Sequence, residues 1–253
     1  MTPPLTRPER VALLSTCIVD QLFPEVGLAT IRLLDRHGVK AEFPQGQTCC
    51  GQPLFNMGYR EEARVLALHT LSVFERYEAV VLPSGSCTAM VKVFYPDLFP
   101  PGDPAHARME ALAAKTFELS QFLVQRLGIS DAGASFDAGV TYHDGCHCLR
   151  ELRVRDEPRA LLRSVTGCRL IEMEGCDACC GFGGTFSVKF GEISSAMVRD
   201  KVAAIEATGA DFVVTTDSSC LMQIHGALSR AGSRVRPLHL AQLLAGERPA
   251  EKA

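Results

Sequence analysis

The chain has 253 residues, of which 47% are hydrophobic and 22% charged, and its formal net charge is −3. This ordinary globular composition supports a buried core without disulfide staples. The small negative charge excludes an electrostatic nucleic-acid interface, and no apolar run reaches the ~18–20 residues that span a membrane. The first ten residues lack the apolar segment of a secretory signal, so we expect a cytoplasmic protein.

The first 100 residues predict three short strands separated by helices. Apolar runs predict strands at Val11–Ser15, Val39–Phe43 and Ala79–Leu82. Apolar residues at helical spacing predict helices over about Pro24–His37 and Tyr59–Tyr77. Each predicted strand leads toward a cysteine.

Residues 101–137 are predicted to link this region to a second one, residues 138–253, and to contain a helix over Glu110–Leu127. The second region predicts the same alternation of strands and helices. Its predicted strands are Gly139–Tyr142, Arg169–Met173 and Phe212–Thr215, and its predicted helices are Pro158–Val165 and Glu192–Ala207. This order predicts an α/β fold of two tandem repeats, each a mostly parallel sheet with flanking helices.

Eleven cysteines are present, and eight of them follow the repeat. In the first half 31 residues separate Cys17 from the Cys49-Cys50-Gly51 motif, and 36 residues separate Cys50 from Cys87. The second half repeats this order with Cys146, Cys179-Cys180-Gly181 and Cys220, at intervals of 32 and 39 residues. Self-similarity at this period indicates a duplicated unit.

The repeated cysteines all follow predicted strands. Ligands of parallel α/β sheets gather beyond the carboxyl ends of the strands, so we expect four thiols to meet in each half. A reducing compartment disfavours a disulfide framework. Binding of a metal or cluster is therefore the favoured interpretation.

Four thiolates match the usual ligand count of a [4Fe–4S] cluster, and the chain would hold one or two such clusters. Adjacent cysteines reach different iron atoms more readily than one small ion, and Gly51 and Gly181 allow close approach of the backbone. Zinc stays open for the first repeat, although the usual Cys-x2–4-Cys knuckles are absent there. A redox-active vicinal disulfide at either cysteine pair is a further alternative.

Each half resembles the cysteine-rich CCG domain, which also occurs in one of the subunits of heterodisulfide reductase and in one of those of anaerobic glycerol-3-phosphate dehydrogenase. Across about residues 10–245 the chain is similar to the lactate-utilisation branch of this family. The resemblance rests on Phe23–Gly27, Gln47–Pro53, Gly58–Ala63, Pro83–Cys87, Tyr142–His147 and Cys179–Phe186. It implies cluster ligation by Cys17, Cys49, Cys50, Cys87, Cys146, Cys179, Cys180 and Cys220.

The resemblance also implies two partners, a ferredoxin-like iron–sulfur subunit and a third lactate-utilisation subunit. One departure stands out. The wider family ends its motif with Cys-x-x-Cys, and the first cysteine of that pair is Ser84 in one half and Asp217 in the other. Ligation by a fifth cysteine, and heterodisulfide chemistry with it, is therefore not expected at these positions.

Three cysteines lie outside the repeat. Cys168 is predicted to be a core residue, Cys148 lies close to the second motif, and Cys176 is a candidate extra ligand. His143, His147 and Arg150 flank Cys146 and are the candidate catalytic residues, because they could bind a carboxylate substrate or move a proton.

No flavin, nicotinamide or phosphate-loop motif is found in the sequence. The cysteines therefore favour an electron-transfer subunit of a multi-subunit oxidoreductase, inactive alone, and the family resemblance implies that it takes part in oxidising L-lactate to pyruvate. Two alternatives stay open. The chain could be a scaffold subunit stabilised by zinc or a cluster, or its cluster could bind the substrate directly.

Overall fold

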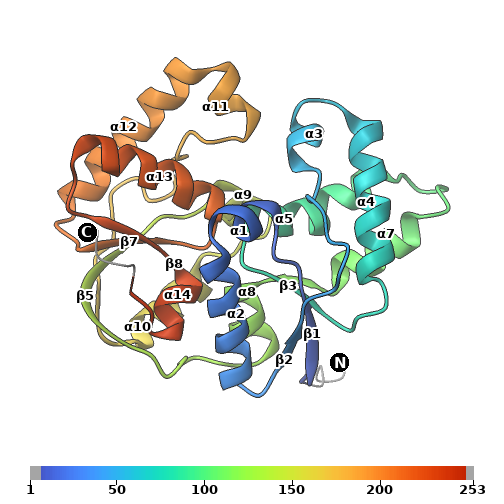
Figure 1. The fold of residues 1–253 in the computed structure, drawn as a ribbon, viewed down its shortest axis with the longest axis horizontal. Helices are drawn as coiled ribbons and strands as arrows, with labels where there is room; N and C mark the ends of the chain where they lie inside the picture. Colours follow the sequence, from blue (N-terminus) through green and yellow to red (C-terminus); the bar gives the residue numbers. More distant parts are fainter. Residues whose placement is uncertain (1–6, 249–253) are drawn as a thin grey trace. The chain divides into compact units, whose positions relative to one another are not determined.

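The computed structural model describes residues 7–248, and the chain divides into two compact units between Ser130 and Asp131. Each unit contains a four-stranded sheet in which all neighbouring strands are parallel. Figure 1 labels most of the strands and helices of the two units. The predicted α/β architecture of two tandem repeats is confirmed.

The first sheet has the strand order β2-β1-β3-β4. Its strands are β1 (Arg10–Leu13), β2 (Lys40–Glu42), β3 (Val80–Leu82) and β4 (Thr116–Glu118). The central strands β1 and β3 are buried and almost wholly aliphatic, as expected for strands covered on both faces. All the predicted strands of this half are present with shifted ends.

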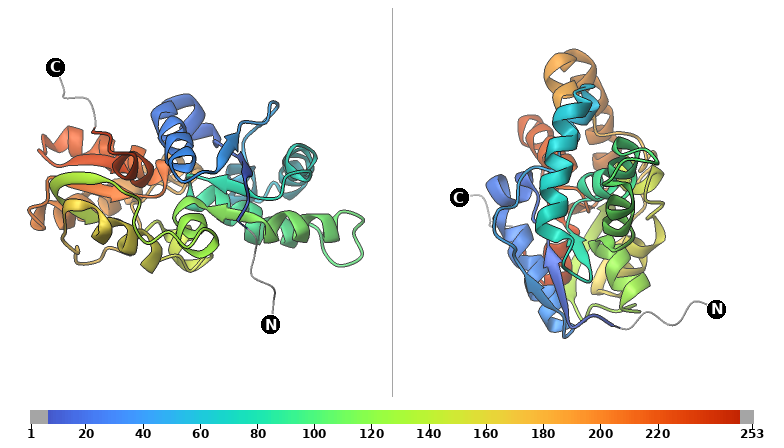
Figure 2. Two further views of the ribbon diagram at one scale, coloured as in Figure 1. Left: turned by 90° about the horizontal axis from the view of Figure 1, so that it is seen from below. Right: turned by 90° about the vertical axis from the view of Figure 1, so that its right-hand side faces the viewer.

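Helices cover both sides of the first sheet, and α2 and α4 lie on opposite sides of β1 (Figure 2). The helices of this unit are α1 (Cys17–Leu22), α2 (Pro24–Arg36), α3 (Gln52–Asn56), α4 (Arg60–Phe74), α5 (Gly85–Ala89), the π-helix η1 (Met90–Phe94), α6 (Tyr95–Leu98), α7 (His106–Ala114), α8 (Leu119–Gln121) and the π-helix η2 (Phe122–Arg126).

The single helix predicted over Glu110–Leu127 is wrong. Helix α7 ends at Ala114, and β4 follows and pairs with β3, so that Val80 lies opposite Thr116. The buried Glu118 side chain then accepts hydrogen bonds from the backbone N–H groups of Ser120 and Gln121 and starts a new helix. Pairing with a buried strand outweighs local helix propensity here.

The second sheet has the order β6-β5-β7-β8. Its strands are β5 (Ser135–Tyr142), β6 (Thr166–Leu170), β7 (Phe212–Thr215) and β8 (Arg236–His239). The predicted strand Arg169–Met173 begins three residues earlier than expected, and the edge strand β8 was not predicted. The segment 101–137 thus supplies β4 to the first sheet and the start of β5 to the second.

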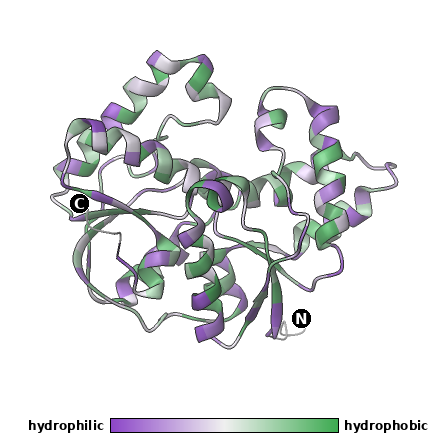
Figure 3. Cartoon of the chain, in the orientation of Figure 1, coloured by the Kyte–Doolittle hydropathy of each residue, from purple (hydrophilic) through white to green (hydrophobic). Residues whose placement is uncertain are grey.

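The second unit has the helices α9 (Cys146–Arg150), α10 (Asp156–Ser164), α11 (Thr185–Lys189), α12 (Gly191–Ala207), α13 (Ser218–Ala231) and α14 (Leu240–Ala245). Hydrophilic and hydrophobic residues alternate along the longer helices of both units (Figure 3). This pattern gives each helix a buried and an exposed face. Within residues 7–248 no helix has both the length and the apolar character needed to cross a membrane.

Candidate metal centres

Four cysteines of the first unit meet at the carboxyl edge of its sheet. Cys17 begins α1 directly after β1, Cys49 and Cys50 follow β2, and Cys87 lies in α5 after β3. The Cys17 and Cys49 sulfurs are 3.7 Å apart, and the Cys50 thiol contacts both Cys49 and Cys87. The fold therefore joins residues that lie up to 70 positions apart in the sequence, as Cys17 and Cys87 do.

Hydrogen bonds favour one thiolate in this group. Donation by the Cys17 and Cys50 thiols, together with the Gly51 backbone N–H, lowers the pKa of Cys49 to about 3. The same contact with Cys49, reinforced by burial, raises the pKa of Cys17 well above its usual range. Binding a metal would release the protons that the other thiols hold, because thiolates are the ligands.

A pocket of about 360 Å³ opens beside Cys17 and Cys49 and is also lined by Thr16 and Gln47. Gln47 fixes the loop, because its side chain accepts from the Ser15 backbone N–H at 3.0 Å and donates to the Leu13 carbonyl at 2.9 Å. Thr16, with a φ of 70°, adopts a conformation that favours glycine. Backbone strain of this kind often marks functional sites.

The second unit gathers its four cysteines in the same way. Cys146 begins α9 after β5, Cys179 and Cys180 follow β6, and Cys220 lies in the first turn of α13 after β7. The Cys180 thiol donates to the Cys220 sulfur at 3.3 Å, and Cys146 contacts Cys179. Donation by Cys146 and Cys180, together with the Gly181 N–H at 3.3 Å, lowers the pKa of Cys179 to about 2.

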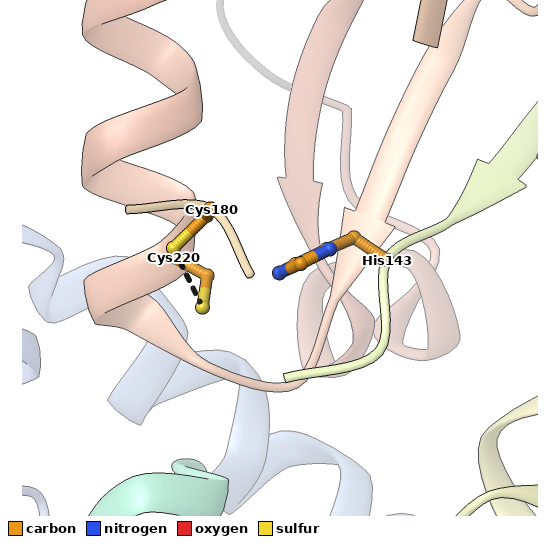
Figure 4. A group of neighbouring side chains, drawn as sticks. All are labelled: His143, Cys180 and Cys220. Carbon is orange, nitrogen blue, oxygen red and sulfur yellow. Dashed lines mark hydrogen bonds between the residues drawn. The ribbon is translucent and has the colours of Figure 1, made fainter. Parts of the chain in front are cut away.

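His143 joins the second group. Its ligand atoms and those of Cys180 and Cys220 all lie within 4.8 Å of one another, and all three residues are buried. Figure 4 shows the imidazole, which comes from the loop after β5, pointing toward the two sulfurs. Donation by Cys180 and the nearby imidazole lower the pKa of Cys220 to about 7 against the effect of burial.

The other two candidate catalytic residues have different surroundings. His147 is half-buried in α9, with Nδ1 3.6 Å from the Glu151 carboxylate. Arg150 is exposed at the end of the same helix. Of the three candidates, His143 is the one that the fold brings to the thiols at ligand distance.

The cysteines outside the repeat also differ in environment. Cys148 is buried and accepts a hydrogen bond from Thr216 at 3.7 Å. Cys168 is half-buried on the edge strand β6 rather than deep in the core, and burial raises its pKa. The Cys176 sulfur lies 3.6 Å from the Arg159 guanidinium, and burial and the Asp144 contact raise its pKa.

Sequence reasoning missed the charged residues around this second group. The buried Arg159 guanidinium makes two 2.8 Å hydrogen bonds to the Asp144 carboxylate and also binds Glu172. The buried Lys201 ammonium donates to the carbonyls of Gly175, at 2.6 Å, and Cys176, at 3.4 Å. A signal for Lys201 existed, because it falls on the inner stripe of α12 between Val198 and Ile205.

The donor sets fit a thiophilic metal ion or an iron–sulfur cluster. Each half offers four sulfurs at one edge of a sheet, and the glycine of each CCG motif donates its N–H to the first cysteine of the pair. Both glycines have positive φ, 85° and 83°, which lets the backbone turn tightly around the cysteines.

Comparison with known proteins defines the class. A model of the CCG cysteine-rich domain matches residues 11–92 and 140–225, one match in each unit, so the chain belongs to the CCG cysteine-rich domain family. Within it the chain is 47% identical over 236 residues to lactate utilization protein A of Geobacillus kaustophilus, covering 93% of this chain and 98% of that protein. The protein of the same name from Shouchella clausii is 47% identical over 234 residues, covering 92% and 98%.

One solved structure supports the fold. A hypothetical protein from Helicobacter pylori matches with a TM-score of 0.65 at 12% sequence identity, over 96% of this chain and 50% of that chain. At this identity the likeness concerns the fold alone. The resemblance to the lactate-utilisation branch of the CCG family that the sequence predicts is confirmed by the relatives.

Proposed function

We propose that this protein takes part in lactate utilization as an iron–sulfur electron-transfer subunit of a multi-subunit oxidoreductase. The observation that supports this most directly is the meeting of four cysteine side chains in each half. Relatives named lactate utilization protein A, similar over more than nine-tenths of the chain, supply the substrate. The ligands proposed are Cys17, Cys49, Cys50 and Cys87 in the first site, and Cys146, Cys179, Cys180 and Cys220 in the second.

The chemistry of lactate supports a relay. Oxidation of L-lactate to pyruvate removes two electrons and two protons, normally through a hydride-accepting cofactor. Iron–sulfur clusters transfer single electrons, and two sites in one chain would accept two electrons in sequence. We propose that a ferredoxin-like iron–sulfur subunit and a third lactate-utilisation subunit complete the complex.

The chain's own residues would hold the clusters and keep water away. Cys50, Cys180 and Cys220 are at most 5% exposed, so a bound metal would offset the cost of burying their thiolate charge. The Gly51 and Gly181 N–H groups would stabilise the negative sulfur of the neighbouring ligand.

Zinc is the second candidate for the first site. Tetrahedral Zn–S bonds of about 2.3 Å place ligand sulfurs roughly 3.8 Å apart, and the Cys17 and Cys49 sulfurs are 3.7 Å apart. Thiols in hydrogen-bond contact reach the same distance, so the metal itself has to be measured.

The test is anaerobic purification with iron, acid-labile sulfide and zinc quantified together. We expect a brown protein with iron and sulfide in equal amounts, filling both halves. A colourless protein that takes up zinc alone after anaerobic reconstitution would refute the electron-transfer role. Assays with lactate and an artificial acceptor should give turnover only with the partner subunits present.

A further inference from the structure

His143 has no counterpart among the donors of the first half. It lies three residues before Cys146, and the residue three before Cys17 is Leu14. Leu14 and His143 both follow the central strand of their sheets and are both buried, at 2% and 0% exposed. The repeat therefore replaces an aliphatic side chain with an imidazole at the same place in the fold.

The buried imidazole contacts the Cys220 thiol instead of the nitrogen or oxygen partners that usually satisfy such a group. Within the described residues neither ring nitrogen of His143 has a nitrogen or oxygen hydrogen-bond partner. Buried polar groups are nearly always paired, and each exception calls for an explanation such as a metal ion. The backbone N–H of His143, by contrast, is satisfied by the Val214 carbonyl at 2.8 Å, so the loop itself is well anchored.

The ring is aimed at two thiols. A nitrogen of His143 and the sulfurs of Cys180 and Cys220 lie mutually within 4.8 Å, close enough for one metal atom to bridge them (Figure 4). Neutral imidazole is a common metal ligand beside cysteine, both for zinc and for iron in mixed histidine–cysteine clusters.

We propose that His143 is a metal ligand, so that the second site is a mixed sulfur–nitrogen centre while the first is coordinated by sulfur alone. This inference rests on the proposed metal binding of the second half and adds a ligand that the repeated cysteines do not predict. Four thiolates would bind each centre and the second would carry a neutral imidazole in addition, so the two centres would differ in coordination and in reduction potential.

The experiment labels histidine with ¹⁵N in the full chain, reconstitutes it anaerobically with iron and sulfide, and records pulsed EPR spectra after reduction. We expect a ¹⁵N coupling of the strength that direct ligation gives. His143→Leu, which copies the first half, and His143→Cys should abolish the coupling, and His147→Gln should retain it. Because the primary reading comes from the unaltered protein, a folding defect in one variant leaves the test intact.

Two results would overturn the inference. One is a cluster signal with no ¹⁵N coupling, or with only the weak coupling of a hydrogen bond. The other is a coupling that persists in His143→Cys. A protein that binds zinc and no iron would refute the electron-transfer function instead, and zinc X-ray absorption would then decide the ligand, with sulfur-only coordination refuting the role of His143.

Discussion

The two halves share their thiols and differ in what surrounds them. Cys17 and Cys146, the two CCG pairs, and Cys87 and Cys220 occupy matching places after matching strands. The residue two positions before the first cysteine is Ser15 in one half and Asp144 in the other. The residue three positions before the last cysteine is Ser84 in one half and Asp217 in the other.

The long helix that packs against each CCG motif shows the same difference, with a neutral residue in the first half where the second half has a charged one. Gly51 lies against Ala63 of α4, and Gly181 lies against Ser194 of α12. Seven residues further along these helices, the first half has Thr70 and the second has Lys201, both buried. The two halves thus share the cysteine donors. Buried charged residues lie near the second group of cysteines, and neutral residues occupy the matching positions in the first half.

The largest expected effect comes from removing a ligand in either half. Cys50→Ser should remove the metal of the first half and Cys180→Ser that of the second, and each should leave about half the iron of the unaltered protein. Stability should fall too, by roughly 3 kcal/mol where free metal exceeds its Kd a hundredfold, because the metal binds the native state. Metal analysis and thermal unfolding measure both effects.

Cys168→Ser is the matched control for these variants, because Cys168 is half-buried on β6 and outside the repeat. It should retain the full metal content. If it loses as much iron as Cys180→Ser, the division of the cysteines into ligands and others is wrong.

The next largest loss of stability is expected when the buried ion pair of the second half is broken. Arg159 and Asp144 are 5% and 2% exposed and form a bidentate pair. Arg159→Met should destabilise the protein by about 3–5 kcal/mol, because it leaves a buried carboxylate without its partner. Adding Asp144→Ser, which copies Ser15, should recover most of the loss in urea unfolding. If the double variant is less stable than Arg159→Met, the ion pair with Asp144 is not the main contribution of Arg159 to stability.

A smaller effect separates the two CCG glycines. Ala at Gly51 must adopt a left-handed backbone conformation, at a cost of about 1–2 kcal/mol, but its Cβ would meet Leu66 at an ordinary 3.4 Å. Ala at Gly181 has the same backbone cost, and its Cβ would also lie 2.7 Å from the Ser194 carbonyl oxygen. Gly181→Ala should therefore cost about 1–3 kcal/mol more than Gly51→Ala in urea unfolding. Equal losses would mean that α12 moves aside freely.

The sequence predicts the features that depend on local patterns and misses those that depend on tertiary contacts. The cysteine spacing and the apolar runs predict two mostly parallel sheets and the meeting of the thiols, because strands that alternate with helices pair in parallel and present the residues after them at one edge of the sheet. Strands β4 and β8 escape prediction because their sequences, Thr-Phe-Glu and Arg-Pro-Leu-His, contain no apolar run, and pairing with β3 and β7 decides their conformation. Local propensity says little about such strands.

The charged residues near the second group of cysteines could not be predicted from the sequence for a different reason. Arg159 meets Asp144 through side-chain geometry across 15 positions, with no spacing rule that marks the pair. His143 could be singled out beside Cys146, but its distance to Cys180 and Cys220 depends on how three loops meet. Spacing predicts which residues share an edge of a sheet, and side-chain packing decides which of them touch.

The smallest expected effect concerns a lysine in the first half. Lys92 is half-buried and donates to the carbonyls of Ala113 and Thr116, both at 3.2 Å, beneath the Phe117 ring. Burial lowers its pKa below the ordinary lysine value. The first half therefore also buries positive charge, but beside β4 and the end of α7.

The pH dependence of stability follows from the direction of that shift. As the pH rises through the lowered pKa, folded Lys92 releases its proton while the unfolded chain still holds one, so the free energy of unfolding increases with pH. Below this window both states are protonated, and the full cost of burying the charge is present. Lys92→Met lacks this titration, so its stability relative to the unaltered protein should fall as the pH approaches the ordinary lysine value from below. Urea unfolding at a series of alkaline pH values measures the difference, and curves that stay parallel would mean that the Lys92 ammonium remains hydrated in the folded chain.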